Sequence, residues 1–177
     1  MKIAGIALTM AAIGLTGCSS LVSLHPFVGE QQAVFDPALA GAWGPAGEDE
    51  FYFIRQDGNG YAIRHVEGSH TTKFSAQLFK SGDLRILDLV ADSEDPFQVQ
   101  VHTPLRVWAD GRTLRFATLD SAWLKDNAQK LLATENVGDR VLITAPGDAV
   151  LRFLIGYGAS DQAYSKPAVL ERLSAAW

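Results

Sequence analysis

The stretch EFYFIRQDGNGYAIRHV, residues 50–66, decides the fold. Two runs rich in apolar and aromatic side chains, residues 50–56 and 60–66, flank the polar turn DGNG. Asp, Asn and Gly tolerate the positive backbone φ angles that tight hairpin loops require. The stretch therefore predicts a β-hairpin.

Further short strand patterns lie on both sides of this hairpin. Some alternate strictly between apolar and polar side chains, which is typical of strands buried on one face. The predicted strands cover residues 39–45, 50–56, 60–66, 71–80, 84–90, 97–102, 105–109 and 113–119. Asp110 and Gly111 form the turn of a second hairpin. Pro104 should break the strand at residues 97–102 or force a bulge, because proline cannot donate to a ladder.

The hydrophobic period changes after residue 119. Residues 120–133 place their apolar side chains on one helical face, with Asp120 or Ser121 as a cap. Residues 139–144 predict a short strand, and residues 146–158 a second helix that begins at a proline. Residues 167–175 fit either a final helical turn or a last strand.

These patterns predict a mainly β (α+β) fold. About eight strands should form an antiparallel meander that closes into a barrel or bends into a strongly curved sheet. Two C-terminal helices should pack on it, because a strand that is apolar on one face must bury that face.

The first 17 residues have the three parts of a secretory signal: Lys2, an apolar run, and small residues before the expected cut. The run is shorter than the roughly 18 residues that span a bilayer. The sequence Leu15-Thr16-Gly17-Cys18 resembles the lipobox of bacterial lipoproteins. This resemblance implies cleavage between Gly17 and Cys18, and a covalent lipid on the Cys18 thiol.

The lipobox interpretation divides the chain into a signal peptide (1–17), a lipidated cysteine with a flexible tether (18–35) and one globular domain (36–177). Cys18 is the only cysteine, so no disulfide is expected. No cofactor is expected apart from the covalent lipid. Ser19 after the cysteine resembles the sorting pattern that favours the outer membrane, which implies a protein anchored in the cell envelope and facing the periplasm.

Composition limits the classes of partner. The formal net charge is −5, and no cluster of lysine and arginine is present, which makes the chain a poor candidate for binding nucleic acid. A hydrophobic content of 47% excludes general disorder. A membrane contact would therefore depend on the lipid anchor.

Gly41-Ala42-Trp43 is similar to the G-x-W motif of the first lipocalin strand, where the tryptophan plugs the closed end of the barrel. The family often covers that tryptophan with an arginine from a late strand, and Arg140 is the candidate here. The chain lacks a counterpart of the T-D-Y-type motif of that family. The segments FDPALAGAW and LDSAWL also resemble small bacterial outer-membrane-type lipoproteins that begin a β-domain in this way.

Several aromatic side chains are candidates to line a ligand cavity, because eight-stranded barrels can hold one small ligand. These residues are Trp43, Phe51, Phe53, Tyr61, Phe74, Phe79 and Phe116. The same side chains could instead fill the core. We favour the filled core, because the strands are short and the helices have apolar faces to bury.

Asp88 lies between apolar neighbours in LRILDLV, so it is a carboxylate near a core. It is either a functional carboxylate with a perturbed pKa or a structural group paired with an arginine or with backbone amides. Four histidines raise the question of a metal site. His65 and His70 could approach across a hairpin, joined by His102 or Glu67, but zinc needs three or four converging ligands. We expect exposed hairpin histidines and no metal.

No catalytic template is found. The chain has no G-x-S-x-G elbow, no P-loop and no H-E-x-x-H motif. The sequence therefore predicts a non-enzymatic binding module, anchored to the membrane, for a small apolar ligand or an envelope protein. The alternative is a structural or assembly lipoprotein with a solid core and only an interaction surface. An envelope hydrolase is the third candidate.

Overall fold

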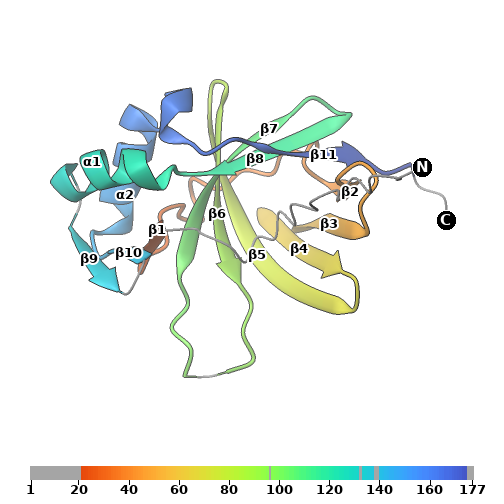
Figure 1. The fold of residues 1–177 in the computed structure, drawn as a ribbon, viewed down its shortest axis with the longest axis horizontal. Coiled ribbons are helices and arrows are strands. Elements are labelled where there is room, and N and C mark those ends of the chain that lie inside the picture. Colours follow the sequence, from red (N-terminus) through yellow and green to blue (C-terminus); the bar gives the residue numbers. More distant parts are fainter. Residues whose placement is uncertain (1–20, 96, 132, 138–139, 175–177) are drawn as a thin grey trace, which may run out of the picture.

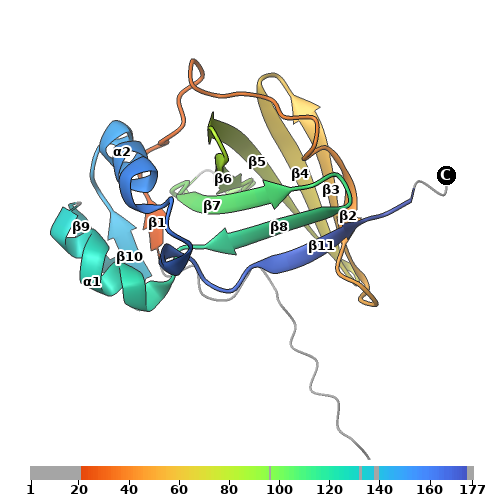
Figure 2. The same ribbon diagram turned by 90° about the horizontal axis from the view of Figure 1, so that it is seen from above.

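The computed structural model describes residues 21–95, 97–131, 133–137 and 140–174. Its centre is a closed antiparallel barrel of eight strands (Figure 2). The barrel strands are β2 (Gly41–Gly44), β3 (Glu50–Asp57), β4 (Gly60–Glu67), β5 (His70–Ser81), β6 (Leu84–Ala91), β7 (His102–Ala109), β8 (Thr113–Thr118) and β11 (Ala168–Arg172). Strands β2 to β8 form a meander, and β11 closes it by pairing with both β8 and β2. The predicted mainly β class and barrel are confirmed.

The predicted central hairpin is present as β3 and β4. Their register runs from Glu50 opposite Glu67 to Asp57 opposite Gly60. Gly58 in the turn has a φ of 57°, the left-handed conformation that glycine adopts without steric cost. The turn residues therefore act as the sequence predicts.

A second layer covers one side of the barrel (Figure 1). It contains a small sheet of β1 (Leu21–Ser23), β10 (Arg140–Ile143) and β9 (Thr134–Val137), joined to β7 through the pair Ser23 and His102. Its helical elements are α1 (Ser121–Leu131), α2 (Gly147–Tyr157) and the 3₁₀ turn η1 (Asp161–Ala163). Asp120 caps α1 by accepting a hydrogen bond from the Trp123 amide at 2.8 Å, as predicted. None of the helices in the described part of the chain is long and apolar enough to cross a bilayer.

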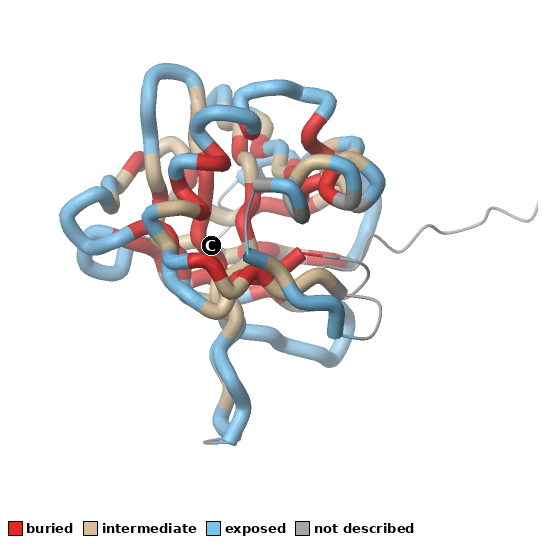
Figure 3. Tube along the Cα trace, turned by 90° about the vertical axis from the view of Figure 1, so that its left-hand side faces the viewer, coloured by how far each residue is buried: buried red, intermediate tan, exposed pale blue. Residues whose placement is uncertain are grey.

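Each layer has its own apolar core, and the buried segments run through the middle of the molecule (Figure 3). The core inside the barrel consists of Leu39, Trp43, Tyr52, Tyr61, Ile63, Ala76, Leu78, Leu87, Leu89, Leu105, Val107, Leu114 and Leu170. The core between the barrel wall and the helices includes Leu21, Phe27, Val28, Ile86, Leu124, Ile143, Val150, Leu151, Phe153 and Leu154. The helices therefore bury their apolar faces against the outside of the barrel.

The prediction of a flexible tether over residues 18–35 is wrong for residues 21–35, the part that the structure describes. Leu21 lies in β1, and Phe27 and Val28 are 2% and 3% exposed. The physical reason is that this segment pairs as β1 with β10 and places apolar side chains in the core between the barrel wall and the helices. The packed domain thus includes the described residues of this segment from Leu21 onward. The signal segment, Gly17 and Cys18 lie outside the described residues.

The expected strand at residues 97–102 is also wrong. Residues 92–95 and 97–101 lie in a long loop that projects from the barrel (Figure 1), and β7 begins only at His102. Side chains in the loop bond its own backbone: Asp95 accepts from the Phe97 amide at 2.9 Å, and Ser93 accepts from the Asp95 amide at 3.1 Å. Such local bonds compete with ladder pairing.

Pro104 neither breaks β7 nor ends it. It is paired opposite Asp88, and the ladder with β6 continues on both sides of it. Proline has no backbone N–H to donate to a neighbouring strand. The pairing of β7 with β8 begins only at Leu105, so at Pro104 one side of β7 has no partner strand that would need this donor.

Candidate functional site

Trp43 belongs to the core inside the barrel and is fully buried. Its indole nitrogen donates to the Leu39 carbonyl at 2.9 Å. The Arg172 guanidinium covers the ring at 4.1 Å from its centroid and donates to the carbonyls of Ala38, Ala40 and Gly111. A buried tryptophan covered by an arginine is the arrangement that the G-x-W resemblance implies, and here the arginine is Arg172.

The prediction that Arg140 covers the tryptophan is wrong. Arg140 begins β10, which belongs to the second layer and not to the barrel. Arg172 occupies the covering position because the last barrel strand, β11, lies beside β2 with Arg172 opposite Trp43.

The inside of the barrel is filled by contacting side chains. Of the predicted cavity residues, Trp43 and Tyr61 belong to this core, and Phe74 and Phe116 pack against it. The Tyr61 hydroxyl accepts from the Asp36 amide at 2.7 Å, and burial raises the pKa of this tyrosine. The interior therefore resembles the filled core that the sequence favours more than an open cup.

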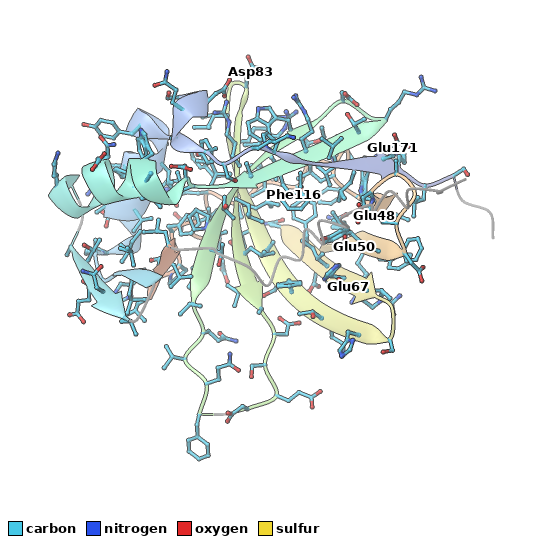
Figure 4. All side chains as sticks on the ribbon, in the orientation of Figure 1. Glu48, Glu50, Glu67, Asp83, Phe116 and Glu171 are labelled. Atoms are coloured by element: carbon cyan, nitrogen blue, oxygen red, sulfur yellow. The ribbon has the colours of Figure 1, made fainter. Side chains whose placement is uncertain are left out.

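The interior also holds a polar group that sequence analysis missed. Glu50 accepts a hydrogen bond from the Tyr52 hydroxyl and lies 2.8 Å from Nε2 of His65. The rings of Tyr52 and His65 stack with centroids 4.4 Å apart. Burial and the Glu50 carboxylate raise the pKa of Tyr52 far above its usual range. Figure 4 shows Glu50 at the barrel end that also carries Glu48, Glu67 and Glu171.

The expectation that the hairpin histidines are exposed is half wrong. His65 is 5% exposed because it faces the barrel interior, whereas His70 is exposed. The register places them apart, with His65 opposite Thr72 and His70 opposite Glu67. Among the described residues, no three His, Cys, Asp or Glu side chains converge to hold a metal ion.

Asp88 lies on the outer face of β6 and is 3% exposed. One carboxylate oxygen accepts from the backbone amides of Phe27 and Val28, at 2.9 and 3.3 Å. The other lies 2.7 Å from Nδ1 of His102. The structure thus pairs Asp88 with backbone amides and a histidine, and this pairing holds the N-terminal segment against the barrel.

Phe51 and Phe53 do not line the barrel interior. They alternate along β3 with Tyr52, whose side chain points inward, so they lie on the outer face. There they border a wide, open hollow of about 1590 Å³, which we call the outer hollow. The outer hollow is lined by Gly41, Ala42, Phe51, Phe53, Ile54, Arg55, Ala62, Ile63, Arg64, Lys73, Phe74, Asp92, Gly111, Arg112, Thr113, Glu171, Arg172, Leu173 and Ser174.

The outer hollow is positively charged, although the chain as a whole has a net charge of −5. Its basic residues are Arg55, Arg64, Lys73, Arg112 and Arg172. Its acidic residues are Asp92 and Glu171. The Arg64 guanidinium lies over the Phe53 ring at 5.2 Å, so apolar and cationic surface are adjacent. Such a surface can bind an anion that also carries an apolar part.

No protein-family model matches the chain, and neither the curated proteins nor the solved structures contain a significant match to it. The fold defines the class: a closed antiparallel barrel of eight strands, consistent with a lipocalin-like fold. A function must therefore be argued from the surfaces of this barrel.

Proposed function

We propose that the chain is a lipid-anchored, non-enzymatic binding module of the cell envelope that takes an anionic, partly apolar small molecule in its outer hollow. The observation that carries this proposal is the combination of Phe51 and Phe53 with the basic residues of the outer hollow on an acidic chain. The fold is compatible with this role, because barrels commonly serve as binding modules.

The outside of the barrel is a better place for a ligand than its inside. The inward side chains form one contiguous core, and Trp43 and Leu78 within it have no exposed surface. A ligand in the interior would have to displace these contacts, whereas the outer hollow is already open. Its volume of about 1590 Å³ exceeds the roughly 300–1,000 Å³ of ordinary small-molecule pockets, which suits an extended molecule such as an acyl chain with an acidic head.

The first test uses decanoate as the probe and uncharged decanol as its matched control, by isothermal titration at low ionic strength. We expect decanoate to bind more tightly, and added salt to weaken its binding because exposed charges are screened. The double variant Arg64→Ala, Lys73→Ala should reduce decanoate affinity about tenfold, equivalent to about 1.4 kcal/mol.

Arg152→Ala is the control for charge, because Arg152 lies on α2, outside the outer hollow, and pairs with Asp148. This variant should bind decanoate as the parent protein does. Equal binding of decanoate and decanol, or an equal loss with Arg152→Ala, would contradict the proposal.

The second test concerns the anchor. Cys18→Ala should leave the protein without lipid, either uncleaved or mislocalised, when cell fractions are compared by immunoblot and intact mass. Cys18 precedes Leu21 by three residues, a reach of at most about 10 Å. A lipid on Cys18 would thus hold the barrel close against the bilayer. Normal cleavage and membrane attachment of the variant would refute lipidation at this residue.

A structural or assembly lipoprotein is the second candidate, and the loop between β6 and β7 favours it. Phe97 and Val99 on this loop are 93% and 67% exposed. Large apolar side chains that lie exposed together often mark a surface that contacts another protein. If decanoate fails to bind, crosslinking from Phe97 in envelope preparations would test whether this loop contacts a protein.

A further inference from the structure

Three neighbouring strands place a row of side chains across the outer hollow. β3, β4 and β5 lie side by side (Figure 1), and their register sets Phe53 opposite Arg64 and Arg64 opposite Lys73. Directly opposite residues on neighbouring strands point to the same face of a sheet, so these three side chains share the outer face. We call Phe53, Arg64 and Lys73 the outer row.

The two cations of the outer row are not neutralised by the protein. Like charges directly opposite one another destabilise a sheet. Neither Arg64 nor Lys73 forms an ion pair within the described part of the chain, although the chain has 20 acidic residues. Other cations do lie within 2.7–3.1 Å of an aspartate oxygen: Lys80, Arg85, Arg106 and Arg152. The outer row therefore has two positive charges that a bound anion can compensate.

The surroundings of the outer row leave it strongly positive. Arg55 lies diagonal to Arg64 across β3 and β4 and is exposed, within reach of the same anion. Asp92 is the acidic residue beside Lys73, and its amide donates to the Lys73 carbonyl at 2.9 Å. Three cations against this one carboxylate leave a net charge of two at this part of the hollow. A dianion matches that charge better than a monoanion.

The geometry of Arg64 suits a head group with several oxygens. One face of its guanidinium lies over the Phe53 ring, 5.2 Å from the centroid. Stacking of this kind leaves the N–H groups at the edge of the guanidinium free to donate. Their planar fork matches two oxygens of a phosphate, and the Lys73 ammonium can add a point charge on the same head.

We propose that the ligand of the outer hollow carries a phosphate monoester as its head, bound by Arg64 and Lys73 together, with its apolar chain along Phe53 and Phe51. This inference rests on the proposed function, because it names the class of anion that the same hollow takes. A phosphate monoester has a charge of about −1.5 to −2 at pH 7, whereas a carboxylate has a single charge. Free phosphorylated molecules and bilayer lipids can both present such a head.

The first experiment compares decyl phosphate with decyl sulfate by isothermal titration of the purified protein at pH 8, below the concentrations at which either forms micelles. The two probes have the same chain and the same tetrahedral head, and they differ by about one charge. We expect decyl phosphate to bind about tenfold more tightly. Equal affinities, or tighter binding of decyl sulfate, would overturn the proposal.

Lys73→Gln and Lys166→Gln form a matched pair for charge. Lys166 is also exposed and forms no ion pair with any described residue, but it lies outside the outer hollow. Lys73→Gln should remain folded, because it removes a like charge opposite Arg64, and it should bind the two probes equally. Lys166→Gln should keep the preference for decyl phosphate. An unchanged preference in Lys73→Gln, or an equal loss in both variants, would contradict binding by the outer row.

Cosedimentation with vesicles distinguishes the two sources of the head. Phosphatidic acid presents a phosphate monoester, and phosphatidylglycerol, at matched surface charge, presents a diester. The N-terminal segment contributes equally to both, so only the difference between the two vesicles counts. Preference for phosphatidic acid supports a bilayer lipid as the ligand, and binding of decyl phosphate without that preference supports a free molecule. Absence of both would overturn the proposal.

Failure of this inference differs from failure of the proposed function. If decanoate binds but decyl phosphate gains nothing over decyl sulfate, only the class of head is wrong. If neither decanoate nor decyl phosphate binds, the outer hollow is not a ligand site, and both proposals are overturned.

Discussion

Replacing Trp43 with alanine should lower the free energy of unfolding by about 3–5 kcal/mol, the usual cost of removing a buried aromatic side chain. The indole is fully buried, and its N–H bonds the Leu39 carbonyl. The truncation would leave a cavity at the barrel end and remove the ring on which the Arg172 guanidinium lies. Urea unfolding followed by far-UV circular dichroism measures the loss.

Two companion variants test whether the tryptophan acts as a plug. Trp43→Phe keeps an aromatic ring beneath Arg172, so it should cost clearly less than the alanine variant. Arg172→Met removes the guanidinium and its bonds to three carbonyls while the indole stays in place. It should cost less than Trp43→Ala as well. A loss below about 1 kcal/mol for Trp43→Ala would show that the barrel end does not depend on this residue.

Local chemistry made the barrel predictable from the sequence. The DGNG turn requires residues that tolerate positive φ, and the alternating runs on both sides of it specify strands without any long-range information. Closure was harder to predict. The pattern of residues 167–175 fits a helix or a strand. Ala168–Arg172 form β11 because β2 and β8, far away in the sequence, offer unpaired edges. The same distance explains why Arg172 was missed as the cover of Trp43.

The candidate site was less predictable because β3 carries aromatic side chains on both faces. Phe51, Tyr52 and Phe53 follow one another, so hydrophobicity alone does not show which of them points inward. The barrel turns Tyr52 inward with the polar residues Glu50 and His65, and leaves both phenylalanines outside. A pattern based on hydrophobicity assigns charged residues to the surface, and it therefore fails where they pair inside a core.

Replacing Asp88 with alanine is expected to lower the free energy of unfolding by about 3–5 kcal/mol, as for other buried charged groups whose partners are left unpaired. The amides of Phe27 and Val28 would lose their acceptor, and so would Nδ1 of His102. The sequence left pairing with backbone amides open for Asp88 but did not show which amides, because the bond from Asp88 to Phe27 spans 61 residues. Urea unfolding measures the loss, and hydrogen exchange at Phe27 and Val28 locates it.

The variant Asp88→Asn distinguishes the role of the bonds to the Phe27 and Val28 amides from the role of the bond to His102. The amide oxygen of asparagine can still accept from Phe27 and Val28, but its NH₂ group would then face His102, whose ring must present an acceptor at Nδ1. The N-terminal segment should therefore stay protected from exchange in Asp88→Asn and lose protection in Asp88→Ala. Equal protection in the two variants would mean that apolar packing alone holds residues 21–28 to the barrel.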